Sequence, residues 1–161
     1  MDGDSTPRFL VDGMVLKLGM YLRCAGFDAE WEHGAGTRAL ARRAQADDRV
    51  LLTRNTHLGA DIPAPQRWLA LASDDPVEQL REVARALGLD LQARLFTRCI
   101  RCNVELAAAP PEEVAARVIE PVRARHRRFW SCPRCGTIFW HGSHVENTCL
   151  RLGLEPPQVP L

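Results

Sequence analysis

A chain of 161 residues can form one ordinary domain, or a small domain followed by a compact module held by a metal. Hydrophobic residues make up 46% of it, too many for a disordered protein, and no apolar run approaches the roughly 20 residues of a membrane-spanning helix. The net charge of +1 hides an asymmetry, because residues 1–93 sum to −3 and residues 94–151 to +5. The basic second half predicts an anionic partner, with nucleic acid as the first candidate, and no membrane partner.

The first half of the chain alternates between two kinds of apolar pattern. Short apolar runs predict four buried strands, at residues 8–12, 27–31, 49–53 and 67–72. Helical spacing predicts three helices between them, at residues 14–24, 37–46 and 76–87. Gly26 and Gly88 are typical of helix ends, and Thr37 is a candidate helix cap. This alternation predicts an α/β domain over residues 1–93 with a largely parallel sheet.

Acidic and amide side chains follow three of the predicted strands. In a parallel α/β sheet, ligands bind beyond the carboxyl ends of the strands, and here these ends carry Asp12, Asn55 and the pair Asp74 and Asp75. Each acid has a second reading as a helix cap, because a predicted helix starts just after it. Arg54, beside Asn55, would meet a phosphate or pair with a neighbouring acid.

Four cysteines form two C-x-x-C pairs, Cys99 with Cys102 and Cys132 with Cys135. Zn²⁺ prefers four soft ligands in a tetrahedron, and two such turns complete a closed, structural site. The alternative is a redox dithiol, which needs only one pair near a βαβ unit. Cysteines in such pairs fit a reducing compartment, and the polar first residues do not resemble a signal peptide, so we expect a cytoplasmic protein.

The predicted zinc ribbon covers residues 94–154, with a strand at 137–140 and a helix at 144–152. His141 is surplus as a ligand once four cysteines are present. The proline-rich end of the chain predicts a loose tail at residues 155–161. The stretch between the cysteine pairs is polar and interrupted by prolines.

An arginine-rich segment precedes the second cysteine pair. Its arginines are Arg123, Arg125, Arg127 and Arg128, and Phe129 and Trp130 follow them directly. Cationic side chains beside aromatic rings are typical of surfaces that bind single-stranded RNA. The alternative is a solvated face next to core aromatics of the ribbon.

Five stretches, in order along the chain, resemble the Mut-seven C-terminal RNase family, a branch of the PIN-like nucleases with a zinc ribbon. They are RFLVDGMVLKLGMYLRCAGFD (8–28), RVLLTRN (49–55), DDPVEQL (74–80), FTRCIRCN (96–103) and FWSCPRCGTIFWHGSH (129–144). The resemblance implies a three-layer PIN-like α/β domain followed by a four-cysteine zinc ribbon. It also implies that His144, in the G-S-H stretch, orders the end of the ribbon or faces substrate.

The same resemblance implies an endoribonuclease that uses Mg²⁺ or Mn²⁺ held by carboxylates. The implied site residues are Asp12, Asn55, Asp74 and Asp75. This chain departs from the family pattern at two positions, since Thr37 and Asn55 stand where the family has acids. Two functions therefore remain open: a ribonuclease weakened by the loss of two acids, or a non-catalytic module that binds RNA or protein.

Overall fold

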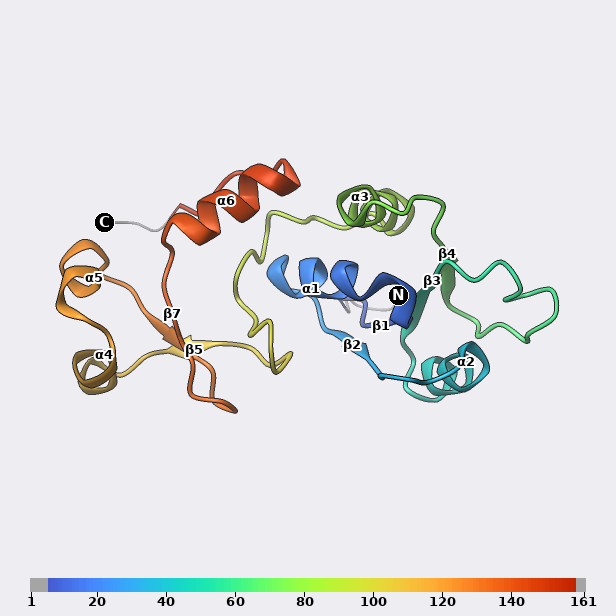
Figure 1. Ribbon diagram of the computed structural model, residues 1–161, viewed down its shortest axis with the longest axis horizontal. Coiled ribbons are helices and arrows are strands. Elements are labelled where there is room, and N and C mark those ends of the chain that lie inside the picture. The colour runs from blue at the N-terminus through green and yellow to red at the C-terminus, as the bar shows by residue number, and fades with distance from the viewer. Residues whose placement is uncertain (1–5, 159–161) are drawn as a thin grey trace, which may run out of the picture.

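The computed structural model describes residues 6–158 and contains two sheets (Figure 1). Residues 1–5, and the last three of the predicted tail, lie outside the described residues. The first sheet has four parallel strands in the order β2-β1-β3-β4. Its strands are β1 (Phe9–Val11), β2 (Ala29–Trp31), β3 (Val50–Thr53) and β4 (Trp68–Ala70). All four predicted strands are confirmed, each shorter than predicted.

Helices cover both faces of this sheet. They are α1 (Leu16–Cys24), which follows a 3-10 turn at Gly13–Val15, α2 (Thr37–Ala46) and α3 (Pro76–Leu87). Alternate strand residues separate the two cores: Phe9 and Val11 pack with α1 and α3, whereas Leu10 and Leu51 pack with α2. The predicted three-layer α/β architecture is confirmed.

The predicted cap of α2 is wrong by one residue. Gly36 occupies the cap position, and the Thr37 hydroxyl makes no capping hydrogen bond. It instead accepts a hydrogen bond from the Asn55 side chain, at 2.9 Å. A contact between distant segments has replaced the local cap.

The second half of the chain has more regular structure than its sequence suggested. A three-stranded sheet runs in the order β5-β6-β7, from β5 (Ala107–Ala108), β6 (Trp130–Ser131) and β7 (Ile138–Phe139). Two short helices, α4 (Pro111–Arg117) and α5 (Glu120–Arg125), lie between β5 and β6. The prolines that suggested interruption occupy the first turns of α4 and α5, where a missing N–H costs nothing.

The last helix joins the two halves of the molecule. Val145, Cys149 and Leu152 of α6 (Ser143–Leu152) are buried in the same apolar cluster as Leu80 and Val83 of α3. The apolar core therefore continues across the predicted boundary between residues 93 and 94, which itself stays a prediction. No helix among residues 6–158 is long and apolar enough to cross a membrane.

The end of α1 packs closely against the start of residues 94–154, which we call the cysteine module. Gly26 has a positive φ of 88°, and the Phe96 amide donates to the Cys24 carbonyl at 2.7 Å. A Cβ built on Gly26 would lie 2.3 Å from the Arg94 carbonyl oxygen. Glycine is required here both for its backbone conformation and for the close approach.

Replacing Gly26 with alanine should lower the free energy of unfolding by more than about 2 kcal/mol, because positive φ and a backbone clash combine. Gly34 is the matched control. It also has positive φ, at 76°, but open space lies around it, so Gly34→Ala should cost only about 1–2 kcal/mol. Urea unfolding of both variants measures the difference. Equal losses would show that the contact with residue 94 is unimportant.

Candidate functional site

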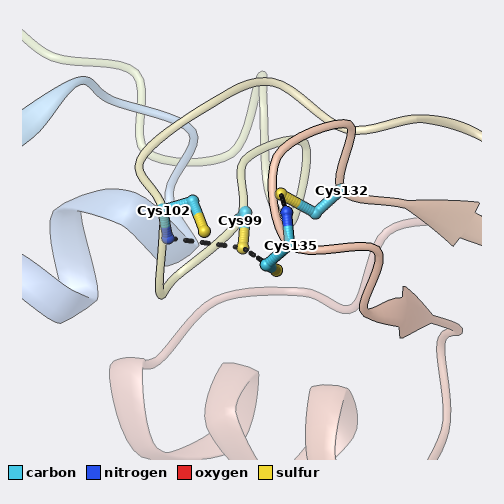
Figure 2. A group of neighbouring side chains, drawn as sticks. All are labelled: Cys99, Cys102, Cys132 and Cys135. Atoms are coloured by element: carbon cyan, nitrogen blue, oxygen red, sulfur yellow. Dashed lines mark hydrogen bonds between the residues drawn. The ribbon is translucent and has the colours of Figure 1, made fainter.

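The four cysteines of the two pairs converge on one point (Figure 2). Their sulfur atoms all lie within 4.8 Å of one another, and those of Cys99 and Cys135 are 4.0 Å apart. Zn–S bonds of about 2.3 Å in a tetrahedron place sulfurs about 3.8 Å apart, so the group fits one zinc ion. Cys99 and Cys132 are buried, as in a structural site. The four-cysteine group could hold zinc, in agreement with the sequence.

Hydrogen bonds and burial act in opposite directions on the sulfur atoms of this group, since burial raises the pKa of Cys99 and of Cys102. The Cys102 amide points at Cys99 Sγ at 3.5 Å, and the Cys135 amide at Cys132 Sγ at 3.4 Å. Thr137 Oγ1 lies 3.2 Å from Cys135 Sγ, and hydrogen bonding to Thr137 lowers the pKa of this thiol to about 6. Such outer partners orient thiolate ligands and tune a metal site.

A buried arginine fixes the first cysteine turn to the parallel sheet. Arg23 of α1 is only 5% exposed. Its Nη1 donates to the carbonyls of Ile100 and Arg101, at 2.8 and 3.1 Å, and its Nε donates to the Ala29 carbonyl at 2.8 Å. Its guanidinium also lies 3.8 Å above the Trp31 ring. Nothing in the local sequence pattern around residue 23 signals this role.

Asn103, just after the first cysteine pair, makes a second link to the sheet. It has a positive φ of 59°, and its side-chain oxygen accepts from the Ala29 amide at 3.1 Å. Its side-chain nitrogen donates to Asp28 at 2.7 Å, and Arg49 also donates to Asp28 at 2.7 Å. Burial acts to raise the pKa of Asp28, but the hydrogen bonds from Arg49 and Asn103 outweigh it and lower the pKa below its ordinary value.

Asp12 lies at the carboxyl edge of the parallel sheet and caps the turn that follows it, as one of its two readings predicted. It is 7% exposed. One carboxylate oxygen accepts from the Met14 amide at 3.1 Å, which caps the 3-10 turn, and the other accepts from the Thr53 hydroxyl at 2.8 Å. The carboxylate is therefore held in one orientation. Thr53 was not predicted as a site residue.

Asn55 joins the same network from the loop after β3. Its amide donates to the Thr53 hydroxyl at 3.0 Å, and its side-chain nitrogen donates to the Thr37 hydroxyl. Its side-chain oxygen accepts from the His57 amide at 2.9 Å. The structure thus brings Asp12, Asn55 and Thr37 together through side chains at the edge of the sheet.

The structure does not add Asp74 and Asp75 to that group. Asp75 caps α3, since its carboxylate accepts from the amides of Val77 and Glu78, both at 2.9 Å. Asp74 is exposed in the preceding bend. Within residues 6–158, the four cysteines are the one group of three or more potential metal-binding side chains whose ligand atoms converge. Asp12 therefore lacks a carboxylate cluster.

The structure does not bring all of the predicted RNA-binding residues together. Arg123, Arg127 and Arg128 line one hollow, whereas Arg125 is not among its lining residues. Arg54 is half-buried beside Asn55, and its Nε finds no hydrogen-bond partner among the described residues. His144 is exposed, with its ring edge-on to Trp140, and like His141 it is not part of the converging cysteine group.

The comparisons with known proteins point to one family. The sequence model of the family described as Mut7-C RNAse domain matches residues 7–152, nearly the whole chain. The match includes both the edge that carries Asp12 and the four cysteines. Searches of curated proteins and of solved structures gave no match.

The cysteine group should carry one zinc ion per chain, and Cys132→Ser should lower this content to less than about 0.1. Cys24→Ala is the control, since Cys24 lies on α1 outside the group, and it should keep the full content. Elemental analysis of purified protein gives the numbers. A zinc content that is unchanged in Cys132→Ser would exclude this ligand set.

Asp28→Asn should lower the free energy of unfolding by about 1.5–3 kcal/mol, because it weakens charge-assisted hydrogen bonds from Arg49 and Asn103. Asn103→Ala in the same background should cost less than it does in wild type, by about 1 kcal/mol. Exposed Asp48 is the control, and Asp48→Asn should change stability by less than about 0.5 kcal/mol. Additive losses in the Asp28 and Asn103 cycle would contradict the link between sheet and cysteine turn.

Proposed function

Because the chain belongs to the Mut7-C RNAse domain family, we propose that it acts on RNA as a weak, divalent-metal-dependent endoribonuclease at the edge that carries Asp12. The observation that carries this proposal is the chain of hydrogen bonds from Asp12 through Thr53 and Asn55 to Thr37. It connects Asp12, Asn55 and Thr37, which come from three separate segments of the chain.

The oxygen atoms at this edge are of the kind that a hard cation prefers as ligands, but they are few. Asp12 supplies one carboxylate and Asn55 one amide oxygen, and each bonded oxygen keeps a further lone pair. Mg²⁺ usually retains several waters and is held by one or two carboxylates together with substrate phosphates. Asp12 and Asn55 would therefore hold Mg²⁺ or Mn²⁺ weakly, with RNA present. When bound, such an ion activates water and neutralises charge on the phosphate.

The chain's own residues have distinct parts in this proposal. The Met14 amide and the Thr53 hydroxyl hold the Asp12 carboxylate in one orientation, since each donates a hydrogen bond to one of its oxygens. Arg54 offers a cation beside the same edge and would hold an RNA phosphate. The neutral Thr37 and Asn55 reduce the negative charge, and that predicts low activity.

Cleavage of single-stranded RNA should require Mn²⁺ or Mg²⁺ and should fall at least about 100-fold in Asp12→Ala, because the one fixed carboxylate is lost. Asp74→Ala is the matched control, as Asp74 is an exposed acid outside the network, and it should cleave like wild type. Gel analysis of a labelled RNA measures both. Equal residual cleavage in Asp12→Ala and wild type would eliminate the proposed site.

The hydrogen bonds of the Asn55 side chain favour a second candidate function, an RNA-binding module without catalysis. Both ends of its side chain are already engaged, with Thr37 and with the His57 amide, so the network is complete without a metal. In that case RNA binds without added divalent ions, and log affinity falls with log salt.

The variant Thr37→Asp with Asn55→Asp separates the two candidates. It places two new carboxylates where two neutral groups now lie 2.9 Å apart, so they repel each other unless a cation binds between them. Mn²⁺ should then raise the melting temperature of the variant by several degrees, more than that of wild type. A gain of cleavage where wild type has none favours the non-catalytic reading of the natural chain.

A further inference from the structure

A hollow of about 530 Å³ lies in the cysteine module, between the two short helices and the small sheet. All of its lining residues fall between Ala108 and Trp130, so none belongs to the Asp12 edge. Its volume lies within the range of small-molecule sites, roughly 300–1,000 Å³. The hollow is therefore a second place on the molecule where a ligand would fit.

Small side chains create this space. Ala108 of β5 lies opposite Trp130 of β6, and the Ala109 amide donates to the Phe129 carbonyl at 2.9 Å. Alanines facing two large aromatic residues leave room that a longer side chain would occupy. Ala115 of α4 lines another wall. The Trp130 ring is itself fixed, because it stacks on His141 with ring centres 4.5 Å apart.

Three arginines give the hollow a positive rim. Arg123, Arg127 and Arg128 are exposed and line it, and no acid is among its lining residues. Within residues 6–158, none of the three forms an ion pair or a side-chain hydrogen bond. Some other arginines are paired with acids, as Arg49 is with Asp28 and Glu30. Three positive side chains beside an apolar wall indicate an anionic ligand with a flat apolar part.

We propose that this hollow binds one nucleotide unit of single-stranded RNA, with the base against the apolar wall and its phosphates on the three arginines. Guanidinium groups match phosphate geometry, and aromatic walls accept any base by stacking. The choice of RNA over another anion rests on the proposed function. The residues that line the hollow differ from those at the Asp12 edge, so RNA binding and RNA cleavage can be tested with separate variants.

Fluorescence anisotropy with a labelled ten-nucleotide oligouridylate, read on zinc-loaded protein without added Mg²⁺ or Mn²⁺, tests the proposal. Arg127→Ala with Arg128→Ala should weaken binding at least about 10-fold and reduce the salt slope by about 1.4, the value for two phosphate contacts on a single strand. Arg85→Ala with Arg151→Ala removes the same charge from exposed arginines that do not line the hollow. This control should change affinity less than about 3-fold. Equal effects from both pairs overturn the proposal, because they would show that binding depends on the overall positive charge of the protein and not on the hollow.

A second experiment tests the contact of the base with the hollow separately from the contacts of the phosphates. Ala108→Leu fills the hollow without altering charge, whereas Ala107→Leu adds the same volume on the opposite face of the strand. Wild type and Ala107→Leu should prefer oligouridylate over an abasic oligonucleotide of equal length, and Ala108→Leu should lose that preference. Zinc content and melting temperature establish that each variant is folded. A preference that survives Ala108→Leu, or tighter binding of an acidic peptide than of RNA, overturns the assignment.

The binding assay stands apart from catalysis, since it contains no added divalent ion. A protein that binds oligouridylate as described but never cleaves RNA keeps this inference and loses the ribonuclease proposal. A protein that cleaves RNA through Asp12 with no effect from the hollow variants does the reverse.

Discussion

The contact between Arg23 and the first cysteine turn is the interaction on which the arrangement of the molecule depends. A buried guanidinium is stable only when its donors are satisfied, and here carbonyls of Ala29, Ile100 and Arg101 satisfy them. Because these acceptors come from β2 and from the cysteine turn, one side chain holds both segments. Asn103 closes the same junction through the Ala29 amide. A zinc ion that fixes the turn would thereby also order an outer strand of the parallel sheet.

This junction lets one chain present two different surfaces. The parallel sheet carries an edge where Asp12 is oriented by Thr53, with a single carboxylate and low negative charge. The cysteine module carries a hollow with three unpaired arginines and an apolar wall. Under the two proposals made above, a hollow that binds RNA phosphates would compensate for an edge that holds a metal weakly, because substrate phosphates would then supply ligands that the protein lacks.

The sequence predicted the parallel sheet and the cysteine group because both depend on patterns that are regular along the chain. Apolar runs identify buried strands, and the spacing of Cys99 and Cys102 identifies a metal turn. The role of Arg23 could not be predicted, since its partners in the cysteine turn, Ile100 and Arg101, lie more than 70 residues away. The cap at Thr37 was predicted wrongly for the same reason, as the hydroxyl engages the distant Asn55. Likewise, α4 and α5 were missed because their prolines start helices as readily as they end them.

Amide hydrogen exchange in β2 would show whether the cysteine turn and the sheet form one structural unit. The Ala29 amide donates to Asn103, so chelating zinc should release it and speed exchange across Ala29–Trp31. Strand β3, which lies inside the sheet, should remain protected at the same time. Protection of Ala29–Trp31 that is identical with and without zinc would contradict the account.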